Sequence, residues 1–289
     1  MFHQPVLVDE VLRWIDLRDE GVYCDCTVGG AGHLVAMLSR TRKARFVGID
    51  CDPEAIAESQ RVTKNYSNRC FLFENSFINL DLILDKIKVK HVRGILFDLG
   101  VSYHQLTTPE RGFSFERDGD LLMRMSPNYP SLREKLLRTR EEDLMEVLRE
   151  YGDVRNYRKI TKQIYGLREK ITTTLDLRRV VEDIVPPRYL KKNLHKVFQA
   201  LRVWTNNELI NLREGLSVAF RRLDAHGRML VISYHSGEDR IVKRFFRALK
   251  DEGRARLLNK KVIKPGDDEI TKNPRARSAR LRVSEKCAS

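Results

Sequence analysis

Two glycine-containing loops, each directly after a run of apolar residues, constrain the fold of this chain most strongly. The first loop reads Gly29-Gly30-Ala31-Gly32-His33 and follows the apolar residues 22–26. The second reads Asp98-Leu99-Gly100-Val101-Ser102 and follows the apolar residues 94–97. Near-continuous apolar runs are typical of parallel strands that are buried on both faces, and open α/β sheets bind ligands at the carboxyl ends of such strands. The two loops therefore predict a nucleotide-sized pocket at one edge of a parallel sheet.

Strand-like and helix-like patterns alternate on both sides of a long interruption. We expect strands at residues 22–26, 45–50, 69–74, 94–99, 228–233, 256–263 and 279–284, and helices at 34–39, 53–64, 78–87, 209–223 and 240–250. This alternation predicts right-handed βαβ units and an α/β fold with a Rossmann-like, mainly parallel sheet.

The interruption has helical periodicity and no convincing strand. Apolar residues recur on one helical face at Tyr157, Ile160, Ile164 and Leu167, and on another at Leu177, Val180, Val181 and Ile184. Thr139 and Glu142 have the spacing of a helix capping box. Because about a hundred residues make a small domain, the sequence predicts an all-helical insertion at 106–206. The residues 1–105 and 207–289 then form one discontinuous domain.

Charge is distributed unevenly along the 289 residues. The formal net charge is +14, and the last fifty residues hold 16 Lys and Arg against 6 Asp and Glu. A basic excess of this kind favours a polyanionic partner, most commonly a nucleic acid, over a merely solvated surface. No run of eighteen apolar residues is present, so we expect no membrane partner.

The cysteines and the first residues bear on localisation and on metals. The early acids Asp9 and Glu10 are unlike a signal peptide, and the odd number of cysteines, five, suggests buried free thiols in a reducing cytoplasm. Cys24 and Cys26 lack a second pair of ligands, so we expect no metal site.

An acidic residue lies between the two glycine loops. Asp50 ends the predicted second strand, where a carboxylate can accept hydrogen bonds from ribose hydroxyls, while Asp52 before Pro53 is the better helix cap. The pyrophosphate fingerprint of NAD-binding folds is missing, and Asp25 and Asp98 suit a cationic amine and sulfonium better than a phosphate. The residues thus favour S-adenosylmethionine, with an NAD-dependent oxidoreductase as the weaker reading.

Nine ordered blocks resemble the bacterial family of 16S ribosomal RNA cytosine-N4 methyltransferases, the RsmH/MraW type. The blocks are His3-x-Pro5-Val6-Leu7, Asp25-x-Thr27-x-Gly29-x-x-Gly32-His33, Gly48-Ile49-Asp50-x-Asp52-Pro53, Asp98-Leu99-Gly100-Val101-Ser102, Arg111-Gly112-Phe113-Ser114-Phe115, Met123-Arg124-Met125, Phe198-Gln199-Ala200-Leu201-Arg202-Val203, Ser233-Tyr234-His235-Ser236-x-Glu238-Asp239-Arg240 and Asn273-Pro274-Arg275-Ala276-Arg277-Ser278. Each block alone is weakly specific, whereas the ordered set runs from one end of the chain to the other.

The resemblance implies a class I S-adenosylmethionine-dependent methyltransferase fold with a helical substrate-recognition insertion. It places the donor pocket on Ala31, Gly32, His33, Asp50, Phe77, Asp98 and Gln105. The chain departs from the family pattern at Ala31, where glycine is usual, at Leu122, where an acid is usual, at Tyr234, where phenylalanine is usual, and in the block 192–196.

The reaction implied is methyl transfer to the exocyclic amine of a cytosine in small-subunit ribosomal RNA, within an assembled or nearly assembled subunit. Such an amine is a poor nucleophile, so the site needs acceptors for its N–H bonds. Asp98 is the first candidate for this catalytic role, and His235 and Glu238 are further candidates, with helix capping as their structural alternative.

Two groups of residues are candidates for RNA contact. Arg111, Phe113 and Phe115 suggest a loop that stacks on bases and binds phosphate. Arg275, Arg277, Arg280 and Arg282 alternate along a strand-like tail, which suggests a phosphate-binding stripe or, alternatively, a charged edge strand. A ribosome-assembly RNA-binding protein with a degenerate donor pocket is the rival to an enzyme, and monomer and homodimer are both open.

Overall fold

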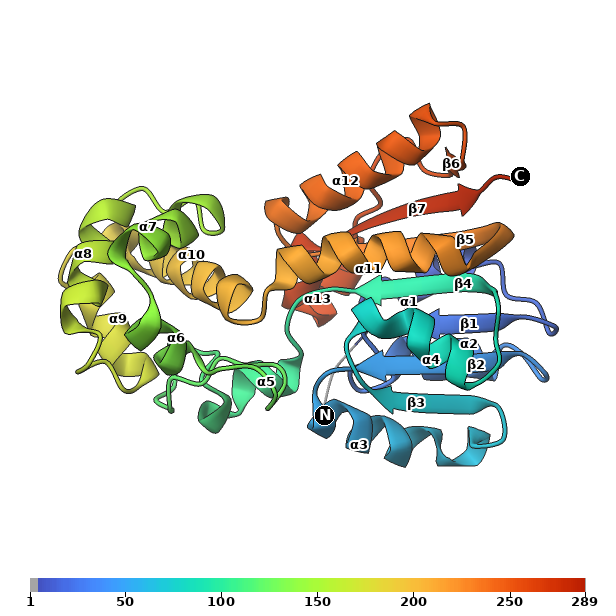
Figure 1. Cartoon of the computed structure of the whole chain (residues 1–289), viewed down its shortest axis with the longest axis horizontal. Coiled ribbons are helices and arrows are strands. Elements are labelled where there is room, and N and C mark those ends of the chain that lie inside the picture. The colour runs from blue at the N-terminus through green and yellow to red at the C-terminus, as the bar shows by residue number, and fades with distance from the viewer. Residues whose placement is uncertain (1–4, 289) are drawn as a thin grey trace. The chain divides into compact units, whose positions relative to one another are not determined.

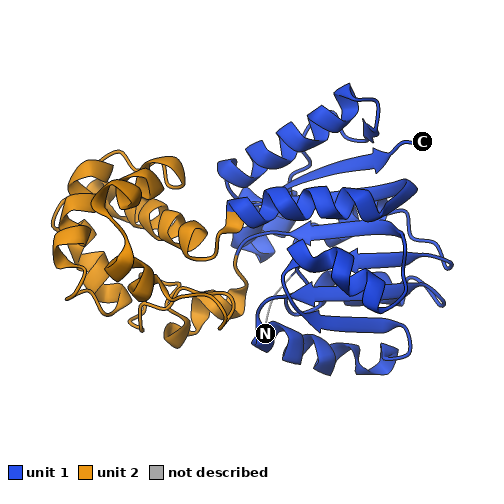
Figure 2. Cartoon of the chain, viewed as in Figure 1, with its two compact units in different colours: residues 1–100, 209–289 blue, residues 101–208 orange. Residues whose placement is uncertain are grey.

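The computed structural model describes residues 5–288 of the chain. The chain divides into two compact units, of which unit 1 comprises residues 1–100 and 209–289, and unit 2 comprises residues 101–208 (Figure 2). The sequence predicts the insertion at residues 106–206, so unit 2 begins slightly before and ends slightly after the predicted bounds. His3, the first residue of the resemblance, lies outside the described residues.

Unit 1 is built on a seven-stranded sheet with the order β3-β2-β1-β4-β5-β7-β6 (Figure 1). The strands are β1 (Val22–Asp25), β2 (Arg45–Asp50), β3 (Cys70–Glu74), β4 (Val92–Asp98), β5 (Leu223–Ser233), β6 (Ala255–Leu257) and β7 (Arg280–Lys286). Every paired neighbour is parallel except β7, which runs antiparallel to both β5 and β6. The predicted α/β fold is therefore confirmed.

The strand order reverses between β1 and β4. From β1 the chain moves outward through β2 to β3, and it then returns to the other side of β1 to form β4. In an open sheet this reversal leaves a crevice beyond the carboxyl ends of the two central strands. The functional residues predicted from the sequence in unit 1 are concentrated at that end.

Helices cover both faces of the sheet. They are α1 (Val8–Trp14), α2 (Gly32–Ser39), α3 (Pro53–Thr63), α4 (Leu80–Lys86), α11 (Glu208–Arg222), α12 (Ser236–Asp251) and α13 (Asp267–Lys272), with short 3-10 turns η1 (Lys64–Tyr66), η2 (Phe77–Asn79) and η4 (Pro274–Ser278). Successive residues of a strand point to opposite faces. Tyr23 accordingly packs in the cluster with α1 and α2, while Cys24 packs in the cluster with α4, α11 and α12.

The end of the sheet differs from the sequence prediction. The strand expected at 256–263 pairs only over β6, and Ile263 forms an isolated bridge to Leu281. The intervening residues include Lys260 and Lys261, which are exposed and leave the segment without an apolar face to bury.

Unit 2 is helical, as predicted. Its elements are α5 (Tyr103–Thr107), η3 (Pro109–Arg111), α6 (Leu132–Arg138), α7 (Glu141–Glu150), α8 (Tyr157–Leu167), α9 (Thr174–Glu182) and α10 (Pro187–Thr205). The only strand-like pairing within it is an isolated bridge between Asp120 and Thr173. The two predicted apolar faces fall on α8 and α9, where Ile160, Ile164 and Leu177 are fully buried in the core of unit 2.

The predicted capping box of Thr139 and Glu142 is wrong. Thr139 is the C-cap of α6 with extended backbone, so α7 begins only after the N-cap Arg140. The guanidinium of Arg140 then pairs with Asp143 at 2.9 Å. Unit 2 instead has capping boxes at Ser102 and Gln105, Ser131 and Glu134, and Thr173 and Asp176.

The five cysteines are all free, and Cys24, Cys26 and Cys70 are buried as expected. Cys51, which was also expected to be buried, is partly exposed at the turn after β2. Among the described residues, no helix is both long enough and apolar enough to cross a membrane.

Close packing at Gly94 generates a stability prediction. A Cβ at this position in β4 would lie 2.7 Å from Cδ1 of Tyr23 and 2.8 Å from Ile15. The Tyr23 ring cannot swing away easily, because its hydroxyl donates to the Asp16 carbonyl and accepts from the Arg18 amide. We expect Gly94→Ala to lower the free energy of unfolding by about 1–3 kcal/mol in urea titrations, through overpacking.

Gly166→Ala is the matched control, because a Cβ at this exposed position of α8 would meet nothing within 4 Å. Helix propensity alone predicts a gain of up to about 1 kcal/mol there. Equal effects of the two substitutions would contradict the packing argument.

Candidate active site

Three carboxylates end three adjacent strands of unit 1. Asp25, Asp50 and Asp98 are the last residues of β1, β2 and β4. Burial raises the pKa of Asp25 to about 8, and the neighbouring charges of Asp98 and Asp50 add to that rise. Burial also raises the pKa of Asp50 to about 6. The three acidic groups therefore share one poorly hydrated edge of the sheet.

The first glycine loop wraps around Asp50. The Gly29 amide donates to Oδ2 of Asp50 at 2.9 Å, and the Asp52 amide donates to Oδ1 at 3.0 Å. The hydroxyl of Ser59 on α3 donates to the Gly29 carbonyl at 2.8 Å and so anchors the loop. The Cys51 amide also bonds to this carboxylate. Because a carboxylate has about four lone-pair sites, Asp50 retains capacity to accept a hydroxyl.

Residues 31 and 32 form the turn into α2. Ala31 adopts a left-handed conformation (φ 60°), and its methyl group is completely buried in the core. Gly32 has no room for a side chain, because a Cβ would lie 2.7 Å from the ring of Pro5. Asp52 caps α3 by accepting from the Glu54 amide at 3.1 Å, as predicted, which leaves Asp50 outside the helix cap.

Asp98 has polar partners on both carboxylate oxygens. The hydroxyl of Tyr234 donates to Oδ1 at 2.8 Å, and Nδ1 of His33 lies 3.6 Å from Oδ2. The Asp98 amide donates to Oγ1 of Thr27 at 2.6 Å, which ties the end of β4 to the loop after β1. The carboxylate is thus held in place from two sides at the centre of the crevice edge.

The tautomer of His33 follows from its second partner. Its Nε2 lies 2.8 Å from the Val6 carbonyl, which only accepts hydrogen bonds, so Nε2 carries a proton. Nδ1 then faces Asp98, and both side chains are at most 8% exposed.

His235 and Glu238 form a capping box at the start of α12. The carboxylate of Glu238 accepts from the amides of Tyr234 at 2.8 Å and His235 at 3.2 Å, and the Glu238 amide donates to Nδ1 of His235 at 3.4 Å. This is the structural alternative that the sequence left open for these two candidates. The box fixes the turn after β5 and thereby holds Tyr234 against Asp98.

The stripe of arginines predicted near the carboxyl end is not one strand. Arg275 and Arg277 lie on η4, where both are exposed, whereas Arg280 and Arg282 lie on β7. Arg280 and Arg282 pair with Asp239 of α12 at 3.4 and 2.7 Å. Burial acts to raise the pKa of Asp239, but the hydrogen bonds and charges of Arg282 and Arg280 together lower it. These two guanidinium groups therefore neutralise a carboxylate of their own unit.

Phe77 packs partly as a core residue. Its ring contacts Phe97 edge-on at 5.4 Å, and it fills the space above Gly215 on α11. Part of the ring stays accessible, which is compatible with the predicted contact to adenine but is also ordinary packing.

The remaining predicted residues belong to unit 2. Gln105 is buried, and its side chain accepts from the Ser102 amide at 3.0 Å in a capping box. The guanidinium of Arg111 donates to the carbonyls of Arg124 and Met125.

The predicted stacking role of Phe113 and Phe115 requires a correction. Both rings are core side chains of unit 2, only 5% and 8% exposed, and Phe115 contacts His195 and Phe198 edge-on. Alternating arginine and phenylalanine suggested an exposed loop, but the rings bury apolar area in this loop.

Sequence reasoning missed two residues of the site, Thr27 and Tyr234. Both lie next to a predicted feature: Thr27 comes two residues after Asp25, and Tyr234 directly follows β5. A hydroxyl-bearing residue at the carboxyl end of a central strand was the available signal.

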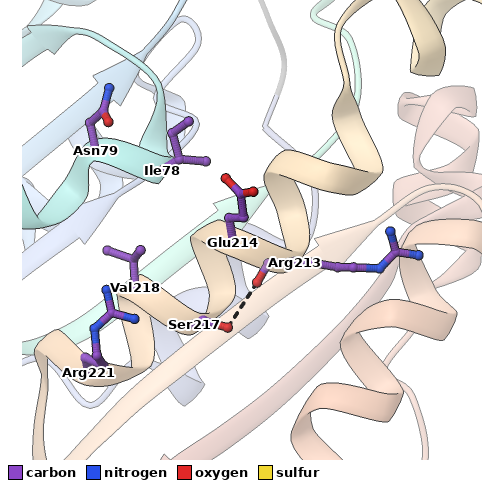
Figure 3. A pocket seen from close by; sticks show the side chains of 7 residues that line it. All are labelled: Ile78, Asn79, Arg213, Glu214, Ser217, Val218 and Arg221. Atoms are coloured by element: carbon purple, nitrogen blue, oxygen red, sulfur yellow. Dashed lines mark hydrogen bonds between the residues drawn. The ribbon is translucent and has the colours of Figure 1, made fainter.

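An open groove of about 570 Å³ lies elsewhere on unit 1, between η2 and α11 (Figure 3). It contains none of the predicted site residues. The Ser217 hydroxyl donates to the Arg213 carbonyl within it, and Arg221 pairs with Asp81. Two of its polar groups are thus already engaged.

The donor set at the crevice suits S-adenosylmethionine. Asp50 has free lone pairs for ribose hydroxyls, and desolvated carboxylates at Asp25 and Asp98 match the cationic groups of the methionine part. The loop between β1 and α2 lacks the Gly-x-Gly-x-x-Gly fingerprint of pyrophosphate-binding folds, which disfavours NAD.

The raised pKa of Asp25 predicts how stability depends on pH. The native state keeps the proton up to about pH 8, whereas the unfolded chain loses it near its ordinary value of 3.8. The native state binds more protons in this window, so the free energy of unfolding decreases as the pH rises from 4 to 8.

We therefore expect Asp25→Asn to be nearly neutral at about pH 4 and to stabilise the ligand-free protein at pH 8, by on the order of a few kcal/mol. Asparagine keeps an acceptor for the Thr27 amide. Asp50→Asn is the control, with a smaller gain that is complete by about pH 7. Thermal melts at about pH 4 and at pH 8 measure both, and destabilisation by Asp25→Asn at pH 8 would contradict the argument.

Comparison with known proteins adds the family. Residues 1–287 match the MraW methylase family. Proteins named Ribosomal RNA small subunit methyltransferase H are similar over 98% of this chain: that of Thermotoga neapolitana is 40% identical, that of Coprothermobacter proteolyticus 40% and that of Nitrosococcus oceani 41%, each over 96% of its own length. An rRNA methylase structure from Streptococcus thermophilus has a TM-score of 0.44 and 12% identity, covering 97% of this chain and 94% of that one, which is too distant to inform function.

The match covers the crevice edge of unit 1 and the whole helical unit in one continuous alignment. The chain is therefore a member of the MraW methylase family, with a class I fold and S-adenosylmethionine as its methyl donor.

Proposed function

We propose that this enzyme transfers a methyl group from S-adenosylmethionine to N4 of a cytosine in small-subunit ribosomal RNA. The observation that carries the proposal is the group of three largely desolvated carboxylates at the carboxyl ends of β1, β2 and β4, in a chain that matches its family from end to end. The substrate is the small-subunit RNA within an assembled or nearly assembled particle.

Each carboxylate has a separate task in this proposal. Asp50 accepts the ribose hydroxyls, and Asp25 faces the cationic end of the donor. Gly32 and Ala31 bring backbone close to the donor, because the methyl group of Ala31 points into the core. When bound, the donor supplies an electrophilic methyl group on a sulfonium.

Asp98 holds the target amine. The lone pair of a cytosine amine is delocalised into the ring, so an acceptor for its N–H bonds helps most when positive charge develops on nitrogen. The Tyr234 hydroxyl and His33 fix the orientation of the carboxylate, and Thr27 fixes its backbone. Tyr234 and His33 are positioning residues in this scheme, and His235 and Glu238 act through the turn that carries Tyr234.

RNA recognition is divided between the two units. The helical unit 2 is the substrate-recognition insertion, and the exposed arginines Arg275 and Arg277 of η4 contact phosphates from unit 1. A base within folded RNA is not accessible, so the target cytosine has to be unpaired or flipped out of its stack.

A ribosome-assembly factor with a degenerate donor pocket is not favoured by any observation. Its support in the sequence was Ala31, Leu122 and the segment 192–196. The methyl group of Ala31 is buried in the core, and the other two belong to unit 2, not to the unit that carries the three carboxylates.

The decisive test is transfer of labelled methyl groups to small ribosomal subunits that lack the modification, followed by nucleoside analysis. We expect N4-methylcytidine from the wild-type protein. We expect Asp98→Asn to reduce the rate by roughly a hundredfold or more, the usual effect of removing a group that stabilises charge in the transition state. Asp81→Asn, a change to a surface carboxylate of α4, is the control and should leave the rate unchanged.

Two results would contradict the proposal. Absence of transfer by a wild-type protein that binds the donor would reject the substrate, and a different methylated nucleoside would reject the target atom. Full activity of Asp98→Asn would reject only the role given to Asp98 and would leave the rest of the proposal standing.

Donor binding should release protons. A cationic ligand favours the ionised carboxylates, and so it lowers the pKa values of Asp25 and Asp50, which burial raises to about 8 and about 6. The affinity for S-adenosylmethionine should therefore increase as the pH rises from 5 to 8. Calorimetry at pH 7 in buffers of different ionisation enthalpy measures the released protons, and Asp25→Asn should abolish most of the release. A binding enthalpy that is independent of the buffer would contradict this.

A further inference from the structure

Helix α12 presents a row of basic side chains to solvent. The exposed residues of this row are Arg240, Lys243, Arg244, Arg247 and Lys250. Their spacing of three, four and seven residues places them along one side of the helix. Over ten residues at 1.5 Å each, the row is about 15 Å long. We call these five residues the α12 row.

The opposite side of α12 is committed to the core. Val242, Phe246 and Leu249 are at most 4% exposed and pack in the cluster that covers the sheet face of α4 and α11. The helix is therefore held rigidly, and its basic side has no apolar residues of its own to bury.

The charge of the row is mostly uncompensated. Arg247 lies 3.8 Å from Asp251, and both side chains are largely exposed. Among the described residues, no ion pair involves Arg240, Lys243, Arg244 or Lys250. The other acids of the helix are engaged elsewhere: Glu238 in the capping box and Asp239 with the arginines of β7.

Several other basic residues of unit 1 are paired with acids. Arg221 and Arg222 of α11 pair with Asp81, and Arg228 and Arg256 both pair with Glu285. Like charges three or four residues apart on a helix destabilise it by about 0.2–0.5 kcal/mol per pair. A row of this kind therefore lowers stability in the free protein and is favourable only opposite an anion.

We propose that the α12 row binds the phosphate backbone of the RNA substrate. This inference rests on the proposed function and adds to it a surface outside the arginines of η4. The row starts close to the reaction site, because α12 begins three residues after the end of β5, and its first turn carries the cap that holds Tyr234. From there it leads away along the outer side of unit 1 (Figure 1).

RNA fits this surface better than a membrane does. Helices that bind membrane surfaces insert an apolar side with aromatic and leucine residues beneath a basic side. The apolar side of α12 is already buried within the protein. A fixed line of cations without apolar neighbours matches a line of phosphates, which bind through charge and carry no sequence information.

The test measures how RNA affinity depends on salt. The probe is a fluorescent RNA duplex of about twenty base pairs and arbitrary sequence, since phosphate contacts do not read sequence. The variant carries Arg240→Gln, Lys243→Gln, Arg244→Gln and Lys250→Gln, because glutamine retains helix propensity close to that of lysine and arginine. Each phosphate contact contributes roughly 0.7–0.9 to the slope of log affinity against log salt. The slope should thus fall by about three if all four cations contact phosphates.

A variant with the same loss of charge controls for net charge. It carries Arg40→Gln, Arg42→Gln, Lys43→Gln and Arg45→Gln, four exposed residues between α2 and the start of β2, at the opposite edge of the sheet. Affinity for S-adenosylmethionine and the melting temperature are measured for both variants, and wild-type values show that unit 1 is folded.

The outcomes separate this inference from the proposed function. A smaller slope and at least tenfold weaker RNA binding in the α12 variant alone would support the surface. Equal losses of RNA affinity in both variants would mean that only net charge matters, and they would overturn the proposed surface. RNA affinity that is unchanged in the α12 variant would overturn it too, as would a wild-type protein that binds vesicles of anionic lipid but not RNA. Methyl transfer to small subunits is assayed independently. If the wild-type protein methylates small subunits and the α12 variant binds RNA as the wild type does, only this surface is overturned and the proposed function stands.

Discussion

Burial of three carboxylates at one edge of a sheet is the constraint on which the site depends. Water solvates a carboxylate well, and a protein that removes this water must supply hydrogen bonds or accept a raised pKa. Unit 1 does both. Asp98 is held by Tyr234 and His33, and Asp50 is held by backbone amides of the neighbouring loops. Asp25 accepts from the Thr27 amide, and burial raises its pKa further than that of Asp50. At this edge a cationic ligand can therefore bind to the ionised carboxylates as their protons are released.

The acids are positioned mainly by hydrogen bonds within the turns that follow the strands. Ser59 anchors the loop after β1, Asp52 ends the turn after β2, and the Glu238 box fixes the turn after β5. The contacts of Asp52 and Glu238 are each local to one strand end, whereas the Ser59 contact links α3 to the loop after β1. Because parallel strands bring their carboxyl ends to the same edge, independent local turns together form one site.

Much of unit 1 could be predicted from sequence because its signals are local. The strand ends at Asp25, Asp50 and Asp98 follow from apolar runs, and the cap at Asp52 follows from its proline. The contact of Tyr234 with Asp98 spans 136 residues and depends on strand order, so no local pattern encodes it. The prediction that Phe113 and Phe115 stack on bases failed for a different reason. An aromatic residue in a loop has the same sequence signature whether its ring is buried or exposed. The arginines from 275 to 282 were read as one strand because alternation alone does not reveal the 3-10 turn that interrupts it.

The antiparallel strand β7 also constrains the order in which the chain can fold. β7 is the last strand in sequence, yet it lies between β5 and β6, and β6 has no other strand partner. On a ribosome, which releases the chain from its amino end, the outer sheet therefore stays open until the final residues emerge. Strands β1, β2 and β4, which carry the three carboxylates, precede unit 2 in sequence, whereas β5 and β7 follow it. Unit 2 is continuous in sequence, so during synthesis its core can close while unit 1 still lacks β5, Tyr234 and β7. The strands on the two sides of the insertion are thus joined into one sheet only after the helical unit has been made.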